Sequence, residues 1–257
     1  MESPITDIDK SSSFDSIDEV EQACLVVPPF PASCLNECRS EWDASFEHPF
    51  VQGLIDGSLS KEKFRFYQMQ DARYLEAFAD TCSILSTRYS DPVDKIWFID
   101  GAKMALVVEQ ELHTQYGQEL GYSASDIAGL TLSPDNRAYQ NHLLVHARQS
   151  SLVEGLAALA PCPWLYTDIG LKIADQMGEI PDDHPYRNWL LTYSDPVFVN
   201  YTNEILALLE RTAQDHGDGY RVKAVEAFRT SARYEWMFWS QAWDMQQWPV
   251  KSIHELK

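Results

Sequence analysis

Apolar and aromatic side chains recur at intervals of three and four residues over long stretches of this chain. One series runs through Phe64, Tyr67, Asp71, Tyr74, Phe78, Cys82 and Leu85. This spacing places side chains on one face of an α-helix. Short breaks rich in Pro, Gly and Asp separate such segments, at residues 56–58, 91–92, 117–134, 181–185 and 195–196. Because convincing runs of alternating apolar and polar residues are absent, the sequence predicts an all-α fold.

The ends of the chain differ in composition from its middle. Residues 1–32 carry seven acidic side chains against Lys10 alone, which predicts a solvated N-terminal tail. Pro28, Pro29 and Pro31 predict a stiff hinge, and whether residues 24–30 dock on the domain as an extended arm stays open. We expect one helical domain over residues 33–250, for which 45% hydrophobic residues are ample, and a short tail at residues 251–257.

Charge and cysteine content narrow the functional classes. The formal net charge of −19 disfavours nucleic acid as a partner, because phosphates require neutralisation by Lys and Arg. No stretch approaches the length of a membrane span, and the N-terminus lacks a secretory signal pattern. The five cysteines are an odd number without metal-like spacing. We therefore expect a protein of the reducing cytoplasm that does not contact membranes.

Two acidic residues fall on apolar helical faces. Asp71 lies in the series above, and Glu235 lies in a second one near the C-terminus: Val225, Phe228, Ala232, Glu235, Trp239, Ala242 and Gln246. A buried carboxyl group needs a partner or a hydrogen bond. One such residue is usually part of a structural network. Two of them, surrounded by tyrosines, favour a polar cavity inside the helical bundle.

A cysteine stands between two prolines at the end of a small-residue helical run. Pro161 should stop or kink the helix, and Pro163 should bias Cys162 away from helical backbone geometry. The thiol is then held where the backbone is broken and polar groups face a cavity. The alternative is that Cys162 is a small core residue, since free cysteine is often buried.

A metal site has weaker support. Carboxylate-bridged sites in helix bundles use Glu-x-x-His twice, whereas Glu109 and His113 are four residues apart and no second copy is found. We therefore expect no metal. Arg229 and Arg233 are expected on a solvated helix face.

A longer set of residues resembles a known family. It consists of Trp42, Ser45-Phe-Glu-His-Pro-Phe50, Gly57-Ser-Leu-Ser-Lys-Glu-Lys-Phe64, Tyr67, Gln70-Asp71-Ala-Arg-Tyr74-Leu, Glu109-Gln-Glu-Leu-His113, Ala138-Tyr139, Leu159-Ala-Pro-Cys162-Pro-Trp-Leu-Tyr166, His184-Pro-Tyr186, Trp189, Tyr193, Tyr234-Glu235-Trp-Met-Phe-Trp239 and Ala242-Trp. In this order the set resembles the Cys-containing branch of the thiaminase II (TenA) family. The match covers roughly residues 35–250, and the resemblance implies a single-domain, haem-oxygenase-like multi-helix bundle.

The resemblance also implies an activity and a site. Such enzymes hydrolyse 4-amino-5-aminomethyl-2-methylpyrimidine to the 5-hydroxymethyl compound in thiamin salvage, and many cleave thiamin at the same methylene. Carried across, Cys162 is the nucleophile, Glu235 the acid/base, and Asp71 the group that holds the pyrimidine amine and ring nitrogen. The residues matching the substrate pocket are Tyr74, Tyr139, Tyr166, Tyr193 and Phe238. The resemblance implies no cofactor and a homotetramer.

Two alternatives remain from other functional classes. One is a metal or redox enzyme of the same fold, similar to pyrroloquinoline quinone synthase or the haem-oxygenase-like di-iron oxidases. The other is a non-catalytic, pyrimidine-binding regulatory protein. Stoichiometric iron would favour the first, and pyrimidine binding without turnover would favour the second.

Overall fold

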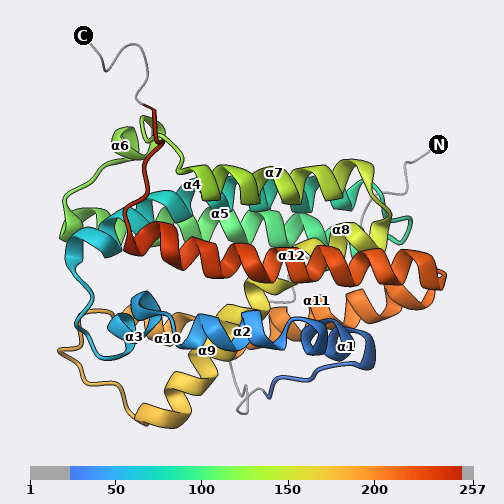
Figure 1. Cartoon of the computed structure of the whole chain (residues 1–257), viewed down its shortest axis with the longest axis horizontal. Coiled ribbons are helices and arrows are strands. Elements are labelled where there is room, and N and C mark those ends of the chain that lie inside the picture. Colours follow the sequence, from blue (N-terminus) through green and yellow to red (C-terminus); the bar gives the residue numbers. More distant parts are fainter. Residues whose placement is uncertain (1–23, 251–257) are drawn as a thin grey trace, which may run out of the picture.

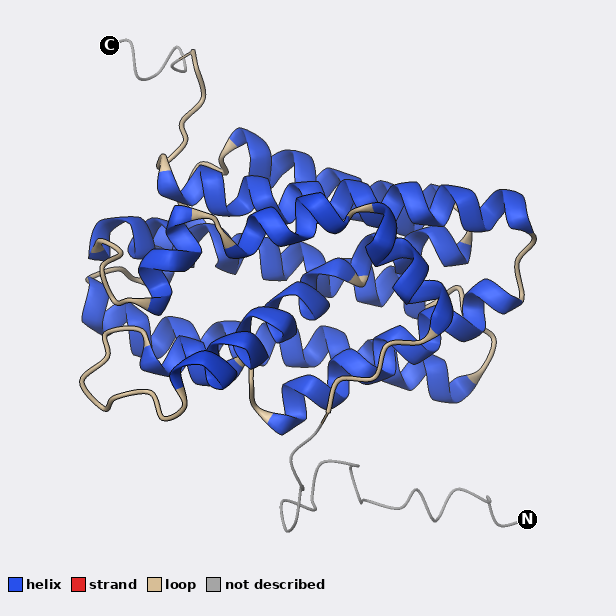
Figure 2. Cartoon of the chain, turned by 60° about the horizontal axis from the view of Figure 1, so that its bottom comes forward, coloured by secondary structure: helices blue, strands red, loops and turns tan. Residues whose placement is uncertain are grey.

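The computed structural model describes residues 24–250, except for the side chains of residues 108–115. This part of the chain forms helices joined by loops and contains no strand, so the all-α prediction is confirmed (Figure 2). The helices are α1 (Pro29–Glu37), α2 (Arg39–Phe46), α3 (Pro49–Ile55), α4 (Lys61–Ser86), α5 (Pro92–Leu120), α6 (Ala124–Ala128), α7 (Pro134–Gln149), α8 (Leu152–Leu159), α9 (Pro161–Met177), α10 (Arg187–Thr192), α11 (Pro196–Gln214) and α12 (Asp218–Trp243). Among them is no helix long and apolar enough to cross a membrane.

Helix α12 occupies the centre of the bundle. The long helices α4, α5, α7 and α12 run along the length of the molecule, and α1, α2, α3 and α9–α11 lie on the other side of α12 (Figure 1). Helix α12 packs against α4, α7 and α8 on one side and against α1, α2, α3 and α9 on the other. Side chains of α12 can therefore meet groups from both layers of the bundle.

Prolines mark the beginnings of many helices in this chain. Six of the described helices carry Pro in their first turn. The missing N–H costs nothing there, because the first N–H groups of a helix have no intrahelical acceptor. Ser60 caps the start of α4: its side chain accepts a hydrogen bond from the Lys63 N–H. Gly57, in the preceding turn, has a φ of +74°.

One predicted break is displaced. Helix α5 continues through Gly117 and ends at Leu120, followed by Gly121 in the left-handed conformation with a φ of +71°. The Gly117 carbonyl accepts hydrogen bonds from the N–H groups of Gly121 and Tyr122. A Cβ atom on residue 117 would lie 2.8 Å from the Tyr122 oxygen. Gly117 is thus needed for the close approach of the returning chain, not as the end of the helix.

The N-terminal hinge prediction is wrong for the described residues. Pro29 and Pro31 lie inside α1, and Phe30 is buried in the core, so the boundary placed after residue 32 falls within a packed helix. Residues 24–28 lie along α11 without secondary structure, where the Asn203 side chain bonds to Val26 N–H and to the Cys24 carbonyl. The arm therefore docks. Residues 1–23 and 251–257 lie outside the described residues, so their prediction as tails stays untested.

Candidate functional site

The Cys162 thiol lies at the junction of α8 and α9. Helix α8 ends at Leu159 and α9 begins at Pro161, which confirms the predicted break. Cys162 itself, however, has helical backbone geometry in the first turn of α9, contrary to the prediction. Pro163 is tolerated beside it, because the first turn of a helix makes no intrahelical N–H bonds. The thiol therefore lies at the positive end of the α9 macrodipole, which favours a thiolate.

The Glu235 carboxyl group is buried in the middle of α12. Only 2% of the residue is exposed, and the Tyr139 hydroxyl donates a hydrogen bond to its Oε1 atom at 2.6 Å. Burial, with a smaller contribution from the charge of Asp71, raises the pKa of Glu235 to about 8, although hydrogen bonds from Tyr139 and Cys162 act in the opposite direction. Glu235 therefore carries a proton for most of the time at neutral pH, unlike an ordinary glutamate.

Asp71 faces the same interior from α4. The residue is buried, as its position on the apolar series predicts. Its negative charge raises the pKa of Glu235 and of Cys162, after the larger effect of burial in each case. The charge of Asp71 affects both Glu235 and Cys162, so these three groups from α4, α12 and α9 share one polar interior. The structure thus brings together the three residues that carry chemical roles in the resemblance.

An aromatic group surrounds Glu235. The ring centroids of Tyr74 and Tyr139 lie 5.0 Å apart, and those of Tyr74 and Phe238 lie 5.5 Å apart. The Tyr74 hydroxyl is buried and has no partner at normal hydrogen-bond distance within the described chain. Tyr74 and Cys162 each influence the pKa of the other, so the hydroxyl and the thiol lie near each other. Tyr74 is therefore a donor available to the thiol or to a bound molecule.

A second aromatic group contains Tyr166 and Tyr193. Their ring centroids lie 4.7 Å apart in an edge-to-face arrangement. Helix α9 can approach the Tyr193 backbone because residue 170 is glycine: a Cβ atom there would lie 2.5 Å from the Tyr193 carbonyl carbon. All five aromatic residues predicted for the pocket are thus buried around the same interior.

Cys162 differs from these neighbours in its exposure. It retains partly accessible surface, whereas Asp71, Glu235 and the five predicted aromatic residues are buried. Burial of the sulfur, followed by the charge of Glu235, holds the pKa of the Cys162 thiol well above its ordinary value, while the Tyr74 hydroxyl lowers it. The resting thiol is therefore protonated, and Glu235, in its ionised form, is the adjacent group able to take its proton.

Tyr67, whose hydroxyl lies in the interior, received no functional role from the sequence. Tyr67 is on the predicted apolar series, one helical turn before Asp71, and its hydroxyl lies 2.9 Å from the Tyr166 hydroxyl. Its position one turn from a buried carboxylate is the signal that would have singled it out. Trp189, which contacts Tyr67, Tyr166 and Tyr193, was likewise given no role.

The described side chains test the prediction of no metal site for part of the chain. Among the residues whose side chains are described, no group of three or more His, Cys, Asp or Glu is arranged to hold a metal ion. The side chains of Glu109 and His113 lie outside the described residues. The expectation that these two residues form no metal site therefore stays a prediction.

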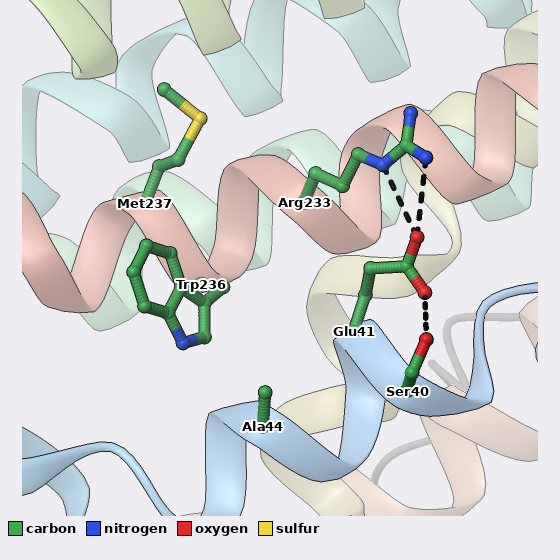
Figure 3. A pocket seen from close by; sticks show the side chains of 6 residues that line it. All are labelled: Ser40, Glu41, Ala44, Arg233, Trp236 and Met237. Carbon is green, nitrogen blue, oxygen red and sulfur yellow. Dashed lines mark hydrogen bonds and ion pairs between the residues drawn. The ribbon is translucent and has the colours of Figure 1, made fainter.

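A surface hollow lies on the opposite face of α12. Figure 3 shows its lining, which includes Trp236 and the Glu41–Arg233 ion pair. Trp236 is 39% exposed, although its neighbour Glu235 points inward. The Arg229 and Arg233 side chains are solvent-accessible, as predicted, and both also contact Glu41, at 2.9 and 3.2 Å, so they tie α12 to α2. None of the predicted site residues lines this hollow.

The sequence is similar to that of known proteins of one family. The model of the TENA/THI-4/PQQC family matches residues 35–245. The aminopyrimidine aminohydrolase of Halalkalibacterium halodurans is 32% identical over 220 residues, which cover 85% of this chain and 97% of that protein.

Solved structures share the fold. The TenA homologue protein from P. horikoshii OT3 superposes with a TM-score of 0.76 at 27% identity, covering 85% of this chain and 99% of that one. A domain with a haem oxygenase-like fold from Shewanella denitrificans superposes with a TM-score of 0.64 at 14% identity, over 83% and 92% of the two chains. These likenesses confirm the haem-oxygenase-like bundle predicted by resemblance.

Proposed function

The chain belongs to the TENA/THI-4/PQQC family, and we propose that it is an aminopyrimidine aminohydrolase of thiamin salvage. It hydrolyses 4-amino-5-aminomethyl-2-methylpyrimidine to the 5-hydroxymethyl compound and cleaves thiamin at the same methylene. The observation that carries this proposal is the burial of Glu235, with a pKa of about 8, beside the Cys162 thiol and the Asp71 carboxylate. The relative from H. halodurans, named for this activity, supports it.

Cys162 and Glu235 together solve the main chemical difficulty. A group bound to the methylene of a pyrimidine leaves poorly while the ring is aromatic. As the Cys162 sulfur bonds to a ring carbon, its proton passes to the Glu235 carboxylate, and Glu235 then gives that proton to a ring nitrogen. Loss of aromaticity allows the protonated amine to leave the methylene as ammonia. Water then adds to the methylene and gives a proton to the Glu235 carboxylate. The C–S bond breaks as the ring becomes aromatic again, and the ring-nitrogen proton returns to the released thiolate, so one difficult step becomes two easier ones.

The environment of Glu235 suits both proton transfers. An acid/base group works best when its pKa is near the working pH, because both protonation states are then populated. Glu235, with a pKa of about 8, meets this condition, whereas an ordinary glutamate does not. The Tyr139 hydroxyl, 2.6 Å from Oε1, holds the carboxyl group in place during the exchange.

Asp71 and the aromatic residues bind the ring in this proposal. The Asp71 carboxylate accepts hydrogen bonds from the pyrimidine amino group and from a protonated ring nitrogen. The flat ring packs against aromatic side chains, and Tyr74, Tyr139 and Phe238 form such a cluster, with the Tyr74 centroid 5.0 Å from that of Tyr139 and 5.5 Å from that of Phe238. Tyr166 and Tyr193 close the pocket on the side of α9.

We also propose that the protein acts in the cytoplasm as a homotetramer, as the resemblance implies. Exposed apolar side chains on α5 support association between copies, because large exposed apolar patches mark interaction sites. The residues are Val93, Ile96, Ile99, Met104, Leu106 and Val107. Analytical ultracentrifugation tests the assembly: a sedimentation mass near 29.4 kDa, that of one chain, would contradict it.

The test of the proposed function is turnover of both substrates by the purified protein. We expect chromatography to show hydroxymethylpyrimidine from aminomethylpyrimidine and, separately, from thiamin, and the ratio of the two rates identifies the preferred substrate. Absence of product from both, with a folded protein that binds the pyrimidine, would replace the hydrolase with a binding or regulatory protein. Stoichiometric iron in the purified protein would instead support the redox alternative.

A further inference from the structure

The ring of Tyr67 is fixed by its neighbours on α4 and α12. The side chain is fully buried, and the ring stacks on Trp239 and Phe64 with centroid distances of 5.7 and 6.0 Å. The Phe238 ring meets it edge-on at 5.9 Å. A ring packed on several sides cannot turn without displacing those neighbours. The Tyr67 hydroxyl therefore has one position.

That position is beside Tyr166. The two hydroxyl oxygens lie 2.9 Å apart, and either can be the donor. A tyrosine hydroxyl has one proton, so only one member of the pair keeps a proton for another acceptor. Whichever hydroxyl donates, this bond ties the Tyr166 hydroxyl to the fixed oxygen of Tyr67.

The Tyr166 hydroxyl borders the polar interior that contains Asp71. Burial raises the pKa of Tyr67, Tyr166 and Tyr193, and the negative charge of Asp71 raises the pKa of each hydroxyl further. These hydroxyls thus lie near the carboxylate that holds the pyrimidine in the proposed function. Tyr166 is the member of the hydrogen-bonded pair that retains slight exposure, at 5%, while Tyr67 has none.

We propose that Tyr67 is a positioning residue whose hydroxyl holds the Tyr166 hydroxyl in place to hydrogen-bond an aminopyrimidine bound at Asp71. Tyr67 touches no substrate itself. It fixes the position of the Tyr166 hydroxyl and thereby the direction of the hydrogen bond that Tyr166 makes. This inference rests on the proposed function, because it assigns a hydrogen-bonding partner to the same aminopyrimidine.

The test is a double-mutant cycle with Tyr67→Phe, Tyr166→Phe and the double variant. We expect Tyr67→Phe to lower kcat/KM for aminomethylpyrimidine about tenfold, the effect of misdirecting one hydrogen bond. Because both residues act through the Tyr166 hydroxyl, the double variant should be no worse than Tyr166→Phe alone. Additive losses in the double variant, or unchanged kcat/KM in Tyr67→Phe, would overturn the positioning role.

Tyr89→Phe is the matched control. It removes the buried hydrogen bond between the Tyr89 and Thr212 hydroxyls, whose oxygens lie 2.8 Å apart, away from the candidate site. We expect it to lower the Tm as much as Tyr67→Phe while leaving kcat and KM unchanged. An equal loss of kcat/KM in Tyr89→Phe would show that general destabilisation explains both.

A second readout separates this inference from the proposed function. An inactive wild-type protein would refute the hydrolase, and the cycle is then measured in the Kd for 4-amino-5-hydroxymethyl-2-methylpyrimidine by calorimetry. Weaker binding by Tyr67→Phe that is absent in the Tyr166→Phe background supports the positioning role without turnover. Additive changes in Kd contradict it.

Discussion

Glu235 on α12 and Glu41 on the adjacent helix α2 have opposite electrostatic environments. Glu41, on α2, contacts the guanidinium groups of Arg229 and Arg233 on the outer face of α12. Burial is the largest single influence and raises its pKa, but the hydrogen bonds from Ser40 and Arg229 and the positive charge of Arg229 together outweigh it and hold the pKa at about 2. Glu235, on the inner face, has hydroxyl and thiol neighbours, and its pKa is about 8.

The difference shows how one residue type acquires two roles. A carboxylate beside guanidinium groups stays charged at any working pH and serves as an ion pair between helices. A carboxyl group surrounded by tyrosines and a thiol changes its protonation state near neutrality, which suits proton transfer. The apolar helical series placed Glu235 inside, and this burial, more than any single contact, separates the two residues.

The largest expected effect comes from removing the inner carboxyl group. Glu235→Gln keeps the shape of the side chain and its hydrogen bond from Tyr139, but it cannot exchange a proton. We expect kcat to fall by about 10³-fold, within the range of general acid–base catalysis. Circular dichroism should show an unchanged helical content. Activity within tenfold of the wild type would remove the proposed role of Glu235.

The pH dependence of kcat/KM tests the raised pKa of Glu235. The free enzyme needs the Glu235 carboxylate to take the thiol proton, and its pKa is raised to about 8. We therefore expect kcat/KM to rise up to tenfold per pH unit until the pH reaches about 8, and then to level off. A profile that is already flat above about pH 5 would show an ordinary glutamate pKa.

Asp168, outside the candidate site, has a pKa between those of Glu41 and Glu235. It accepts a hydrogen bond from the Trp42 indole at 2.9 Å, and burial nevertheless raises the pKa of Asp168 to about 6. The folded state holds this proton more tightly than the unfolded chain, so stability falls as pH rises from about 4 to about 6.

Asp168→Asn should therefore be more stable than the wild type at neutral pH, by about 3 kcal/mol at most. Below about pH 4 this advantage should disappear, because both states of the wild type are then protonated. Urea unfolding of both proteins across this range measures the difference, in which the contributions of other titrating groups cancel. A difference independent of pH would contradict the raised pKa.

The smallest effect is expected on the outer face. Glu41→Gln breaks a partly exposed ion pair, so we expect a loss of about 1 kcal/mol in the free energy of unfolding and no change in kcat. Denaturation together with the turnover assay tests both statements. Loss of turnover comparable to that of Glu235→Gln would erase the distinction between the two faces.

Local features of the sequence predicted most of the fold. The spacing of apolar residues in α4 and α12 and the prolines at helix starts are properties of single segments, and they gave the helices and the buried faces of Asp71 and Glu235. Two local predictions were wrong. Pro163 did not expel Cys162 from the helix, and Pro29 began a helix where a hinge was expected, because prolines are tolerated in a first turn.

Contacts between distant segments were not predictable in the same way. The bonds Tyr139–Glu235 and Tyr67–Tyr166, and the pairing of Glu41 with Arg229, join residues far apart in the chain. Their geometry depends on how the helices pack, which periodicity does not specify. The family resemblance identified candidate roles, while the raised pKa of Glu235 and the hydroxyl next to Tyr166 required the three-dimensional arrangement.

The central claim is that the Cys162 thiol attacks the pyrimidine. The most direct test measures initial rates of hydroxymethylpyrimidine release by the wild type, Cys162→Ser and Cys24→Ser. Cys24 is exposed and lies in the N-terminal arm, so its variant controls for loss of a thiol elsewhere. We predict that Cys24→Ser retains the wild-type rate and that Cys162→Ser loses product release while remaining folded. Turnover by Cys162→Ser at the wild-type rate would contradict the nucleophilic role of Cys162.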